Sequence, residues 1–290
     1  MDQFLQHVLN ALMLGGTYAL LGIGLTLIFG IMRVVNFTHG ELYAFGAYMM
    51  YAFVMLTGAN FFVALALAIL LGALLGAGIE LLLLRRLRGA DIDTTMLVMI
   101  GAWIALQNGE QLAWTGVAKS ISNPFPAAPL VIGPVSVAWN RVFVLVVALS
   151  LIAITYLVIQ KTKLGKAMRA TFQDRDTAAL MGVQIGHIHT VTFALGSALA
   201  AAAGALLGPV FVAYPTMGDL AASKAFAVVI LGGLGSIPGA TLGGFILAMA
   251  EELGAGYISS GYRDAMSFLL IIVILLFRPT GMFAQKERIR

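Results

Sequence analysis

The sequence predicts an all-α, polytopic membrane protein that forms a single transmembrane domain over residues 1–290. Hydrophobic residues make up 60% of the chain and charged residues only 10%, which exceeds the apolar content of ordinary globular domains. The apolar residues also fall into runs of the length, about 17 to 25 residues, that a helix needs to cross the hydrocarbon. The chain has no cysteine, so disulfides and cysteine-containing metal sites are excluded.

The apolar runs, taken in order, predict about eight transmembrane helices with two discontinuous regions. The segment before the first run contains Asp2 and no Lys or Arg. That run therefore lacks the positive start of a cleavable signal peptide, and we expect it to be retained. The predicted crossings are residues 9–31, 41–57, 61–84, 95–115, 141–160 and 190–212, a broken region over 222–256 that supplies two, and a last crossing at 264–278.

The basic residues predict the orientation of these crossings. Most of the 17 Lys and Arg residues fall on one side of the predicted membrane, in Arg33, the loop 85–88, the segment 161–175 and the end of the chain at 278–290. By the positive-inside rule this side is cytoplasmic, which places the N-terminus outside and the C-terminus inside. These loops also explain the net charge of +4, so no nucleic-acid partner is expected.

The first discontinuous region spans residues 36–41. Thr38 and Glu41 have the S/T-x-x-E spacing of a capping box, which predicts that a helix begins there and that both side chains bond its amides. Irregular backbone at membrane depth is tolerated where protein buries it or where it lines a wet cavity. Asn36 and His39 therefore either line a pathway or only satisfy backbone groups. The candidate pathway residues of this region are Asn36, Phe37, Thr38, His39 and Glu41.

The second discontinuous region spans residues 232–239. Its glycines predict the end of one half-helix, while Ser236 can cap the next half-helix and Pro238 can occupy its first turn. The amino end of a half-helix carries partial positive charge and can attract a substrate carboxylate. The candidate pathway residues of this region are Gly232, Gly233, Gly235 and Ser236.

A polar, basic segment at residues 161–189 separates two apolar runs and contains Asp176-Thr177-Ala178-Ala179-Leu180-Met181-Gly182. Asp176 is predicted to cap a helix of little more than one turn, and Gly182 is predicted to end it in the left-handed conformation. The alanines permit close approach of another surface, while Leu180 and Met181 supply adaptable apolar side chains. We therefore predict that this coupling segment docks on a soluble partner in the cytoplasm.

Other polar residues have two open interpretations. Glu110 lies in a predicted crossing, where an ionisable group marks function, yet close enough to its outer end to be hydrated. Glu251 and Glu252 either line an external vestibule or, as we favour, end a helix in solvent. Small residues spaced by four predict close helix packing within the chain; they are Gly72 and Gly76, and Gly196, Ala200, Gly204 and Gly208. The histidines His7, His187 and His189 are expected near membrane interfaces without ligands.

The chain encodes no catalytic or metal-binding constellation and no phosphate-binding loop. The nearest match to such a loop, Gly165-Lys166, is followed by alanine and lacks the upstream glycine. Neither enzymatic activity nor a cofactor on this chain is therefore expected. Two alternatives remain: a permease subunit driven by a separate ATPase, or a self-sufficient secondary transporter or channel. A coupled carrier usually needs an ionisable or carbonyl site at the bilayer midplane. Here the acidic residues cluster toward the span ends, and with the coupling segment this favours the first alternative.

Six short segments in order along the chain carry a family resemblance. They are Gly16-Thr17-Tyr18-Ala19-Leu20, Gly24-Leu25-Thr26-Leu27-Ile28-Phe29-Gly30, Asn36-Phe37-Thr38-His39-Gly40, Met181-Gly182-Val183, Gly232-Gly233-Leu234-Gly235-Ser236 and Arg278-Pro279-Thr280-Gly281. The chain closely resembles the branched-chain amino acid ABC-importer permeases, specifically the shorter of their two permease subunits. The coupling segment resembles the importers' E-A-A-x-x-x-G pattern, with Asp for Glu and Thr for the first Ala. Thr38 replaces the alanine of the family's N-F-A-H-G motif.

The resemblance implies a set of partners. They are a second, longer homologous permease that forms a heterodimer with this chain, two cytoplasmic ATPase subunits that bind ATP and Mg²⁺, and a periplasmic solute-binding protein. It places the chain in a bacterial inner membrane and implies leucine, isoleucine and valine as substrates. Related permeases that carry urea or short amides leave that substrate class open as an alternative.

Overall fold

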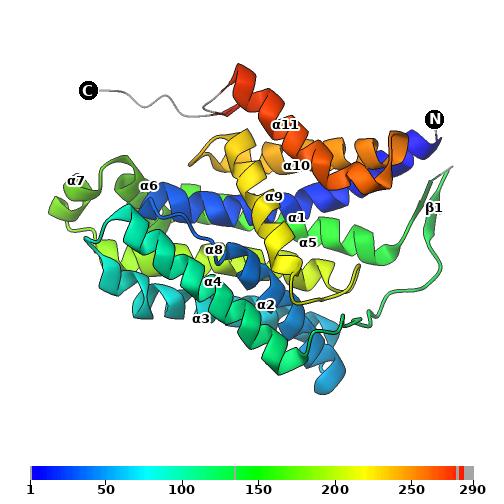
Figure 1. Cartoon of the computed structure of the whole chain (residues 1–290), viewed down its shortest axis with the longest axis horizontal. Coiled ribbons are helices and arrows are strands. Elements are labelled where there is room, and N and C mark those ends of the chain that lie inside the picture. The colour runs from blue at the N-terminus through cyan, green and yellow to red at the C-terminus, as the bar shows by residue number, and fades with distance from the viewer. Residues whose placement is uncertain (1, 134, 279–280, 284–290) are drawn as a thin grey trace.

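Helices make up nearly all of the protein, as the sequence predicts. The computed structural model describes residues 2–133, 135–278 and 281–283. Its helices (Figure 1) are α1 Asp2–Met32, α2 His39–Tyr51, α3 Phe61–Leu82, α4 Ile92–Trp114, α5 Trp139–Lys161, α6 Lys163–Gln173, α7 Arg175–Leu180, α8 Ile185–Leu207, α9 Met217–Gly232, α10 Ile237–Tyr257 and α11 Arg263–Phe277. Short helices cover Ala52–Leu56, Leu84–Leu87 and Ser260–Tyr262, and strands β1 Leu130–Ile132 and β2 Val135–Val137 form an antiparallel hairpin.

The helices confirm the membrane class but not the expected number of crossings. Within the described residues, five helical segments are long and apolar enough to span a membrane: Gln3–Met32, Phe61–Leu87, Trp139–Lys161, Ile185–Leu207 and Ser260–Phe277. The pair α9 and α10 passes the same test together with a bend of 119°, which raises the number to six at most. The expected crossings at 41–57 and 95–115 do not qualify, because α2 has only 13 residues and the polar stretch 107–111 lowers the hydropathy of α4.

The core of the bundle depends on small residues, as predicted. α8 packs against α1, α2 and α3, and α1 packs extensively against α10. A Cβ atom at Gly204 of α8 would lie 1.8 Å from the backbone oxygen of Tyr43 in α2. A Cβ atom at Gly76 of α3 would lie 2.0 Å from Oγ of Ser197 in α8. The glycines therefore let backbones approach closely within the chain.

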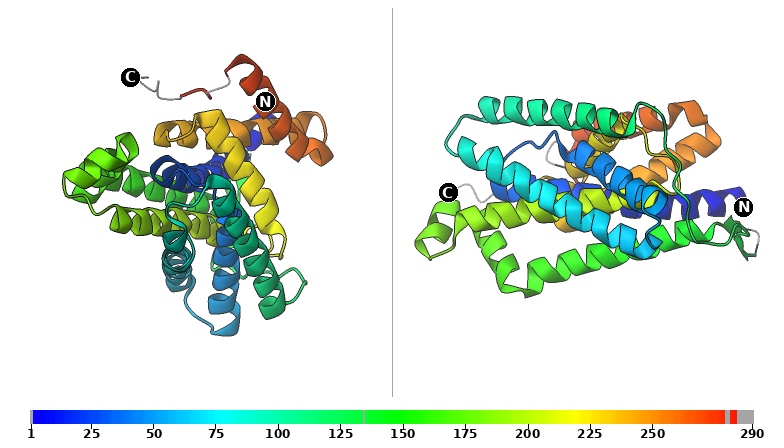
Figure 2. Two further views of the ribbon diagram at one scale, coloured as in Figure 1. Left: turned by 60° about the vertical axis from the view of Figure 1, so that its left-hand side comes forward. Right: turned by 90° about the horizontal axis from the view of Figure 1, so that it is seen from below.

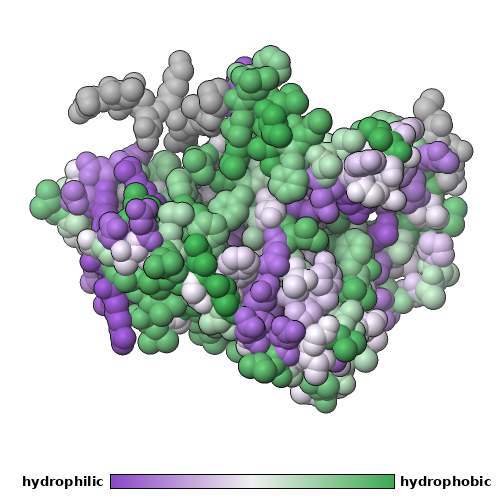
Figure 3. All heavy atoms as spheres, in the orientation of Figure 1, coloured by the Kyte–Doolittle hydropathy of each residue, from purple (hydrophilic) through white to green (hydrophobic). Residues whose placement is uncertain are grey.

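The coupling segment and the hairpin lie at opposite ends of the bundle. In Figure 1 α6 and α7 stand at one end, and the start of α1 with β1 stands at the other. The right-hand view in Figure 2 shows the same separation. Hydrophobic side chains cover much of the middle of the face in Figure 3, and hydrophilic ones gather over α6 and α7. This distribution fits a bundle whose middle is surrounded by lipid.

The first discontinuous region starts a half-helix, but not through a capping box. Nε2 of His39 lies 3.0 Å from the backbone oxygen of Leu21, so α2 begins roughly 16 Å, at 1.5 Å per residue, before the end of α1 at Met32. Thr38 is at the N-cap position without a side-chain bond to the helix, and its hydroxyl donates to Asn36 Oδ1 at 2.5 Å. Glu41 accepts a hydrogen bond from Trp103 at 3.1 Å. The predicted capping box is therefore wrong, because buried partners occupy both side chains.

The second discontinuous region has the predicted local structure. α9 ends at Gly232, and Gly233 and Gly235 follow with φ values of +93° and +82°. Oγ of Ser236 accepts from the amide of Gly239 at 3.1 Å, and Pro238 occupies the first turn of α10. The amide of Met282 donates to the backbone oxygen of Leu231 at 2.9 Å, which satisfies one carbonyl at the end of α9. Pro279 and Thr280 of the predicted terminal motif lie outside the described residues.

Candidate coupling segment and translocation pathway

The short helix α7 is capped by Asp174 rather than by Asp176. Oδ1 of Asp174 accepts from the amides of Asp176 and Thr177 at 3.0 and 2.9 Å. The hydroxyl of Thr177 donates to the other carboxylate oxygen at 2.8 Å. The hydrogen bonds from the backbone and side chain of Thr177 hold the pKa of Asp174 below its ordinary value. The cap predicted at Asp176 is wrong, because the backbone is already helical at Arg175 and only Asp174 has the extended conformation of an N-cap.

The far end of α7 exposes apolar side chains. Leu180 and Met181 are 87% and 81% exposed, and Ala179 beside them is exposed as well. Ala178, in contrast, is buried against the protein. Gly182 has the predicted left-handed backbone, with φ of +86°, and its amide donates to the backbone oxygen of Ala179 at 3.0 Å. A hydrogen-bonded turn thus presents an apolar tip away from the bundle.

The coupling segment contacts the second discontinuous region. A Cβ atom at Gly235 would lie 2.8 Å from the ring of Phe172 in α6, and one at Gly30 of α1 would lie 3.0 Å from the same ring. A cavity of about 450 Å³ opens beside this contact, bordered by the end of α1 and by residues 171–176. The structure therefore brings the residues around Gly235 and the coupling segment together at one end of the bundle.

The first discontinuous region lies elsewhere, deeper in the bundle. Asn36, Thr38 and His39 are fully buried, and the ring of Phe37 packs against Phe226 of α9 at 5.8 Å between centroids. The contacts of His39 are with Leu21 and Gly24 of α1. Oδ1 of Asn36 and Nε2 of His39 each contact a backbone group, whereas Nδ2 of Asn36 and Nδ1 of His39 are buried without a hydrogen-bond partner among the described residues.

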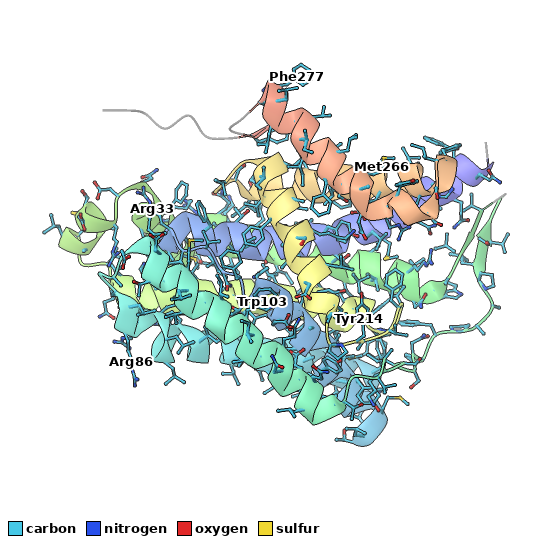
Figure 4. The ribbon with its side chains drawn as sticks, viewed as in Figure 1. Arg33, Arg86, Trp103, Tyr214, Met266 and Phe277 are labelled. Carbon is cyan, nitrogen blue, oxygen red and sulfur yellow. The ribbon has the colours of Figure 1, made fainter. Side chains whose placement is uncertain are left out.

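Glu41 belongs to a buried polar cluster between α2, α4 and α9. Nε1 of Trp103 donates to it, and Figure 4 labels Trp103 on α4 where this helix passes in front of α2. A Cβ atom at Gly218 of α9 would lie 2.5 Å from the carboxylate of Glu41. One turn along α4, Gln107 donates to Asp219 of α9 at 3.0 Å. Two short helices thus begin beside the same carboxylate, because Glu41 and Gly218 both lie in first turns.

The polar face of α4 continues toward the end of the helix. Glu110 is only 3% exposed, and both its carboxylate oxygens lack a hydrogen-bond partner in the described part of the chain. Trp114 stacks on Tyr48 of α2 at 5.0 Å between ring centroids. Glu110 is therefore buried rather than hydrated. Sequence reasoning missed Trp103 and Asp219 as members of this face, although residues 103, 107, 110 and 114 have the helical spacing that could have revealed it.

Glu251 and Glu252 are also buried, which overturns the favoured solvent-exposed interpretation. Nζ of Lys224 lies 2.6 Å from Glu251 and 2.9 Å from Asp264, and the hydroxyl of Tyr18 donates to Glu251 at 2.8 Å. Arg263 pairs with Glu252. His189, near the start of α8, is buried as well, at 4% exposure. Pairing allows the two glutamates to be buried, and their partners come from other helices.

Broken helices inside an apolar bundle, with carboxylates buried along their first turns, are features of integral membrane transport proteins. The family described as "Branched-chain amino acid transport system / permease component" matches residues 7–275. The chain belongs to this family.

The relatives agree with this assignment over the full length. The chain is 37% identical to the high-affinity branched-chain amino acid transport system permease protein BraD of Pseudomonas aeruginosa, over 98% of this chain and 97% of BraD. It is 36% identical to the permease protein LivH of Escherichia coli, over 98% of this chain and 96% of LivH. A more distant relative is the autoinducer 2 import system permease protein LsrC of Escherichia coli, 29% identical over 72% of this chain and 67% of LsrC.

Proposed function

We propose that this chain is the permease subunit of an ABC importer that carries branched-chain amino acids across a bacterial inner membrane. The observation that carries the proposal is the similarity to BraD and LivH over 98% of the chain. Hydrolysis of ATP takes place on separate cytoplasmic ATPase subunits, which bind ATP and Mg²⁺. A second homologous permease completes a heterodimer, and a periplasmic protein delivers the solute.

The ATPase docks on residues 176–182 of the coupling segment. The exposed Leu180 and Met181 support this role, because apolar knobs on a capped turn suit a groove of a soluble partner. The contact of Phe172 with Gly235 gives the docked ATPase a short mechanical route to the break between α9 and α10. With this end in the cytoplasm, the N-terminus lies outside and the C-terminus lies inside, in agreement with the positive-inside rule.

The amino acid passes along the half-helices α2 and α9. The predicted residues Asn36, Phe37, Thr38 and His39 support the start of α2, while Glu41 faces the polar side of α4. The residues that we add to the pathway are Trp103, Gln107, Glu110 and Asp219, because carboxylates kept in a membrane interior are costly and mark transport routes. Gly232, Gly233, Gly235 and Ser236 form the joint that responds to the ATPase.

The test is uptake by the complete importer in proteoliposomes with its binding protein. We expect radiolabelled L-leucine to be taken up with ATP, and urea and acetamide not to be. Ala179→Arg places a bulky charge on the docking face and should abolish uptake and solute-stimulated ATP hydrolysis together. Ala127→Arg, an equally exposed alanine in the loop between α4 and β1, is the matched control and should leave both intact.

Three outcomes would contradict parts of the proposal. Uptake of urea in place of leucine would reject the substrate, and uptake without ATP would favour a self-sufficient transporter. Parental ATP hydrolysis in the Ala179→Arg importer would show that α7 is not the coupling contact.

A further inference from the structure

A second cavity, of about 180 Å³, opens at the same end of the bundle as the coupling segment. It lies where the ends of α1 and α3, the start of α4, and α7 and α8 meet. A cavity of this size holds several waters or one small organic molecule. Its lining includes the charged and polar residues Arg33, Glu80, Arg88, Arg175 and His189. The apolar side chains of Val34, Leu84 and Met96 form part of the remaining wall.

The charges around the cavity are unbalanced. Glu80 is fully buried, and it is neutralised by Arg88, whose Nη2 lies 2.5 Å from Oε1. Its second oxygen accepts from the hydroxyl of Thr190 at 2.5 Å. Arg33 and Arg175 also line the cavity, and neither forms a salt bridge within the described residues. Among the described residues that line this cavity Glu80 is the only acid, and Arg88 pairs with it, so Arg33 and Arg175 border the cavity without a carboxylate of its lining to pair with.

His189 supplies an independent sign of a missing ligand. Its side chain lines the cavity and is only 4% exposed, yet Nε2 has no hydrogen-bond partner among the described residues. A buried polar atom without a partner is rare in native proteins and requires an explanation. An anion in the cavity would accept from this nitrogen and from the two arginines.

The rest of the wall is apolar and selects the kind of anion. Val34, Leu84 and Met96 belong to a lining of aliphatic side chains from three segments. Such a surface disfavours a fully hydrated inorganic ion and accepts a branched aliphatic group. Basic groups with an aliphatic wall therefore fit a small branched carboxylate.

We propose that this cavity binds the carboxylate end of a branched aliphatic amino acid that has reached the cytoplasm, and that occupancy slows further import. The slowing of import rests on the proposed function, whereas carboxylate binding in the cavity does not. Arg175 is the first residue of α7, and Arg33 joins α1 to the segment that leads to α2. Arg33 has a left-handed backbone with φ of +55°, which is uncommon for a residue with a side chain. A carboxylate held by both arginines ties α7 to this connection and resists its movement.

The site is tested by binding radiolabelled L-leucine to the detergent-purified importer without its solute-binding protein. We expect 4-methyl-2-oxopentanoate, which keeps the carboxylate and lacks the ammonium, to compete, and 3-methylbutylamine, which lacks the carboxylate, not to compete. Inorganic phosphate should compete only weakly. Arg175→Gln should weaken binding about tenfold or more, the loss expected for one charge-assisted hydrogen bond, and Arg175→Lys should restore part of it.

Two further variants guard against a folding defect. Arg33→Gly removes the charge but permits the left-handed backbone, so it should weaken binding without lowering the unfolding temperature. Arg86→Gln is the matched control, because Arg86 lies on the short helix Leu84–Leu87 that Arg88 follows but does not line the cavity, and Figure 4 shows it away from Arg33. This control should bind leucine as the parent does.

The outcomes separate this site from the proposed function. Three results would overturn the site: competition by the amine rather than the oxo acid, competition by phosphate as strong as that by the oxo acid, or an equal loss of leucine binding in Arg86→Gln. In proteoliposomes whose ATPase subunits face the lumen, leucine enclosed in the lumen should slow uptake by the parent importer and not by the Arg175→Gln importer. ATP-driven uptake of leucine without any such binding would leave the import function standing and reject the site. Leucine binding in the expected pattern without leucine uptake would support the site and reject the proposed import function.

Discussion

At the scale of single residues, some buried charges find partners on other helices. Glu251 stands beside Glu252 in the sequence and reads as part of a hydrated helix end, yet it is fully buried and bonded to Tyr18 and Lys224. A charge inside the bundle is tolerated because a partner neutralises it. Burial does not decide between the aspartates of the coupling segment, since Asp174 and Asp176 are both exposed. The extended backbone of Asp174 places its carboxylate at the helix amides.

Exchange of amide hydrogens should distinguish the two aspartates. Asp174→Ala removes the cap and should speed exchange across residues 176–181, whereas Asp176→Ala should leave it near the parental rate. Because the pKa of Asp174 is lowered in the folded protein, its contribution to α7 is present above the carboxyl's ordinary pKa. That contribution is lost as the pH falls through the lowered value. Faster exchange in Asp176→Ala than in Asp174→Ala would contradict the assignment.

At the scale of elements, the half-helices and the small-residue contacts set the architecture. α2 starts beside the middle of α1, and α9 starts beside Gly40 and Glu41 of α2. α8 can lie close to α2 and α3 because glycine is present on one side of each contact. These contacts position the polar face of α4 against the first turns of α2 and α9.

Adding one methyl group to a contacting glycine should therefore be costly. At Gly204 the new Cβ would meet the backbone oxygen of Tyr43 at 1.8 Å, whereas at Gly78 of α3 nothing lies within 4 Å. We expect Gly204→Ala to destabilise the purified protein by about 1 to 3 kcal/mol through overpacking. Gly78→Ala should be neutral or slightly stabilising. Thermal unfolding in detergent measures both, and equal midpoints would refute the close contact of α2 with α8.

At the scale of the whole molecule, the basic residues and the apolar bundle together predict how the protein sits in the membrane. α6 and α7 lie at the end opposite the β1–β2 hairpin (Figure 1). The positive-inside rule assigns the end with α6 and α7 to the cytoplasm. The proposed coupling contact and the proposed carboxylate site both require this orientation, since ATP and an imported amino acid are inside the cell.

Labelling of single cysteines in intact cells tests the orientation. The chain has no native cysteine, so Ala127→Cys and Asp176→Cys each provide one exposed thiol. An impermeant maleimide should label position 127 in intact cells and position 176 only after the membrane is opened. The opposite pattern would reverse the topology and remove α7 from the ATPase.

The sequence by itself determined the helical membrane class, the start of the half-helix α10 at residue 237, and the left-handed turn at Gly182. These features depend on hydropathy, glycine, proline and serine within a few residues, and such local preferences survive in any tertiary context. Only the tertiary structure decided the partners of Glu41 and Glu251 and the burial of His189. Trp103 lies 62 residues from Glu41 in the sequence, and no local rule selects such a pair. The cost of burying an unpaired polar group selects it once the helices have packed.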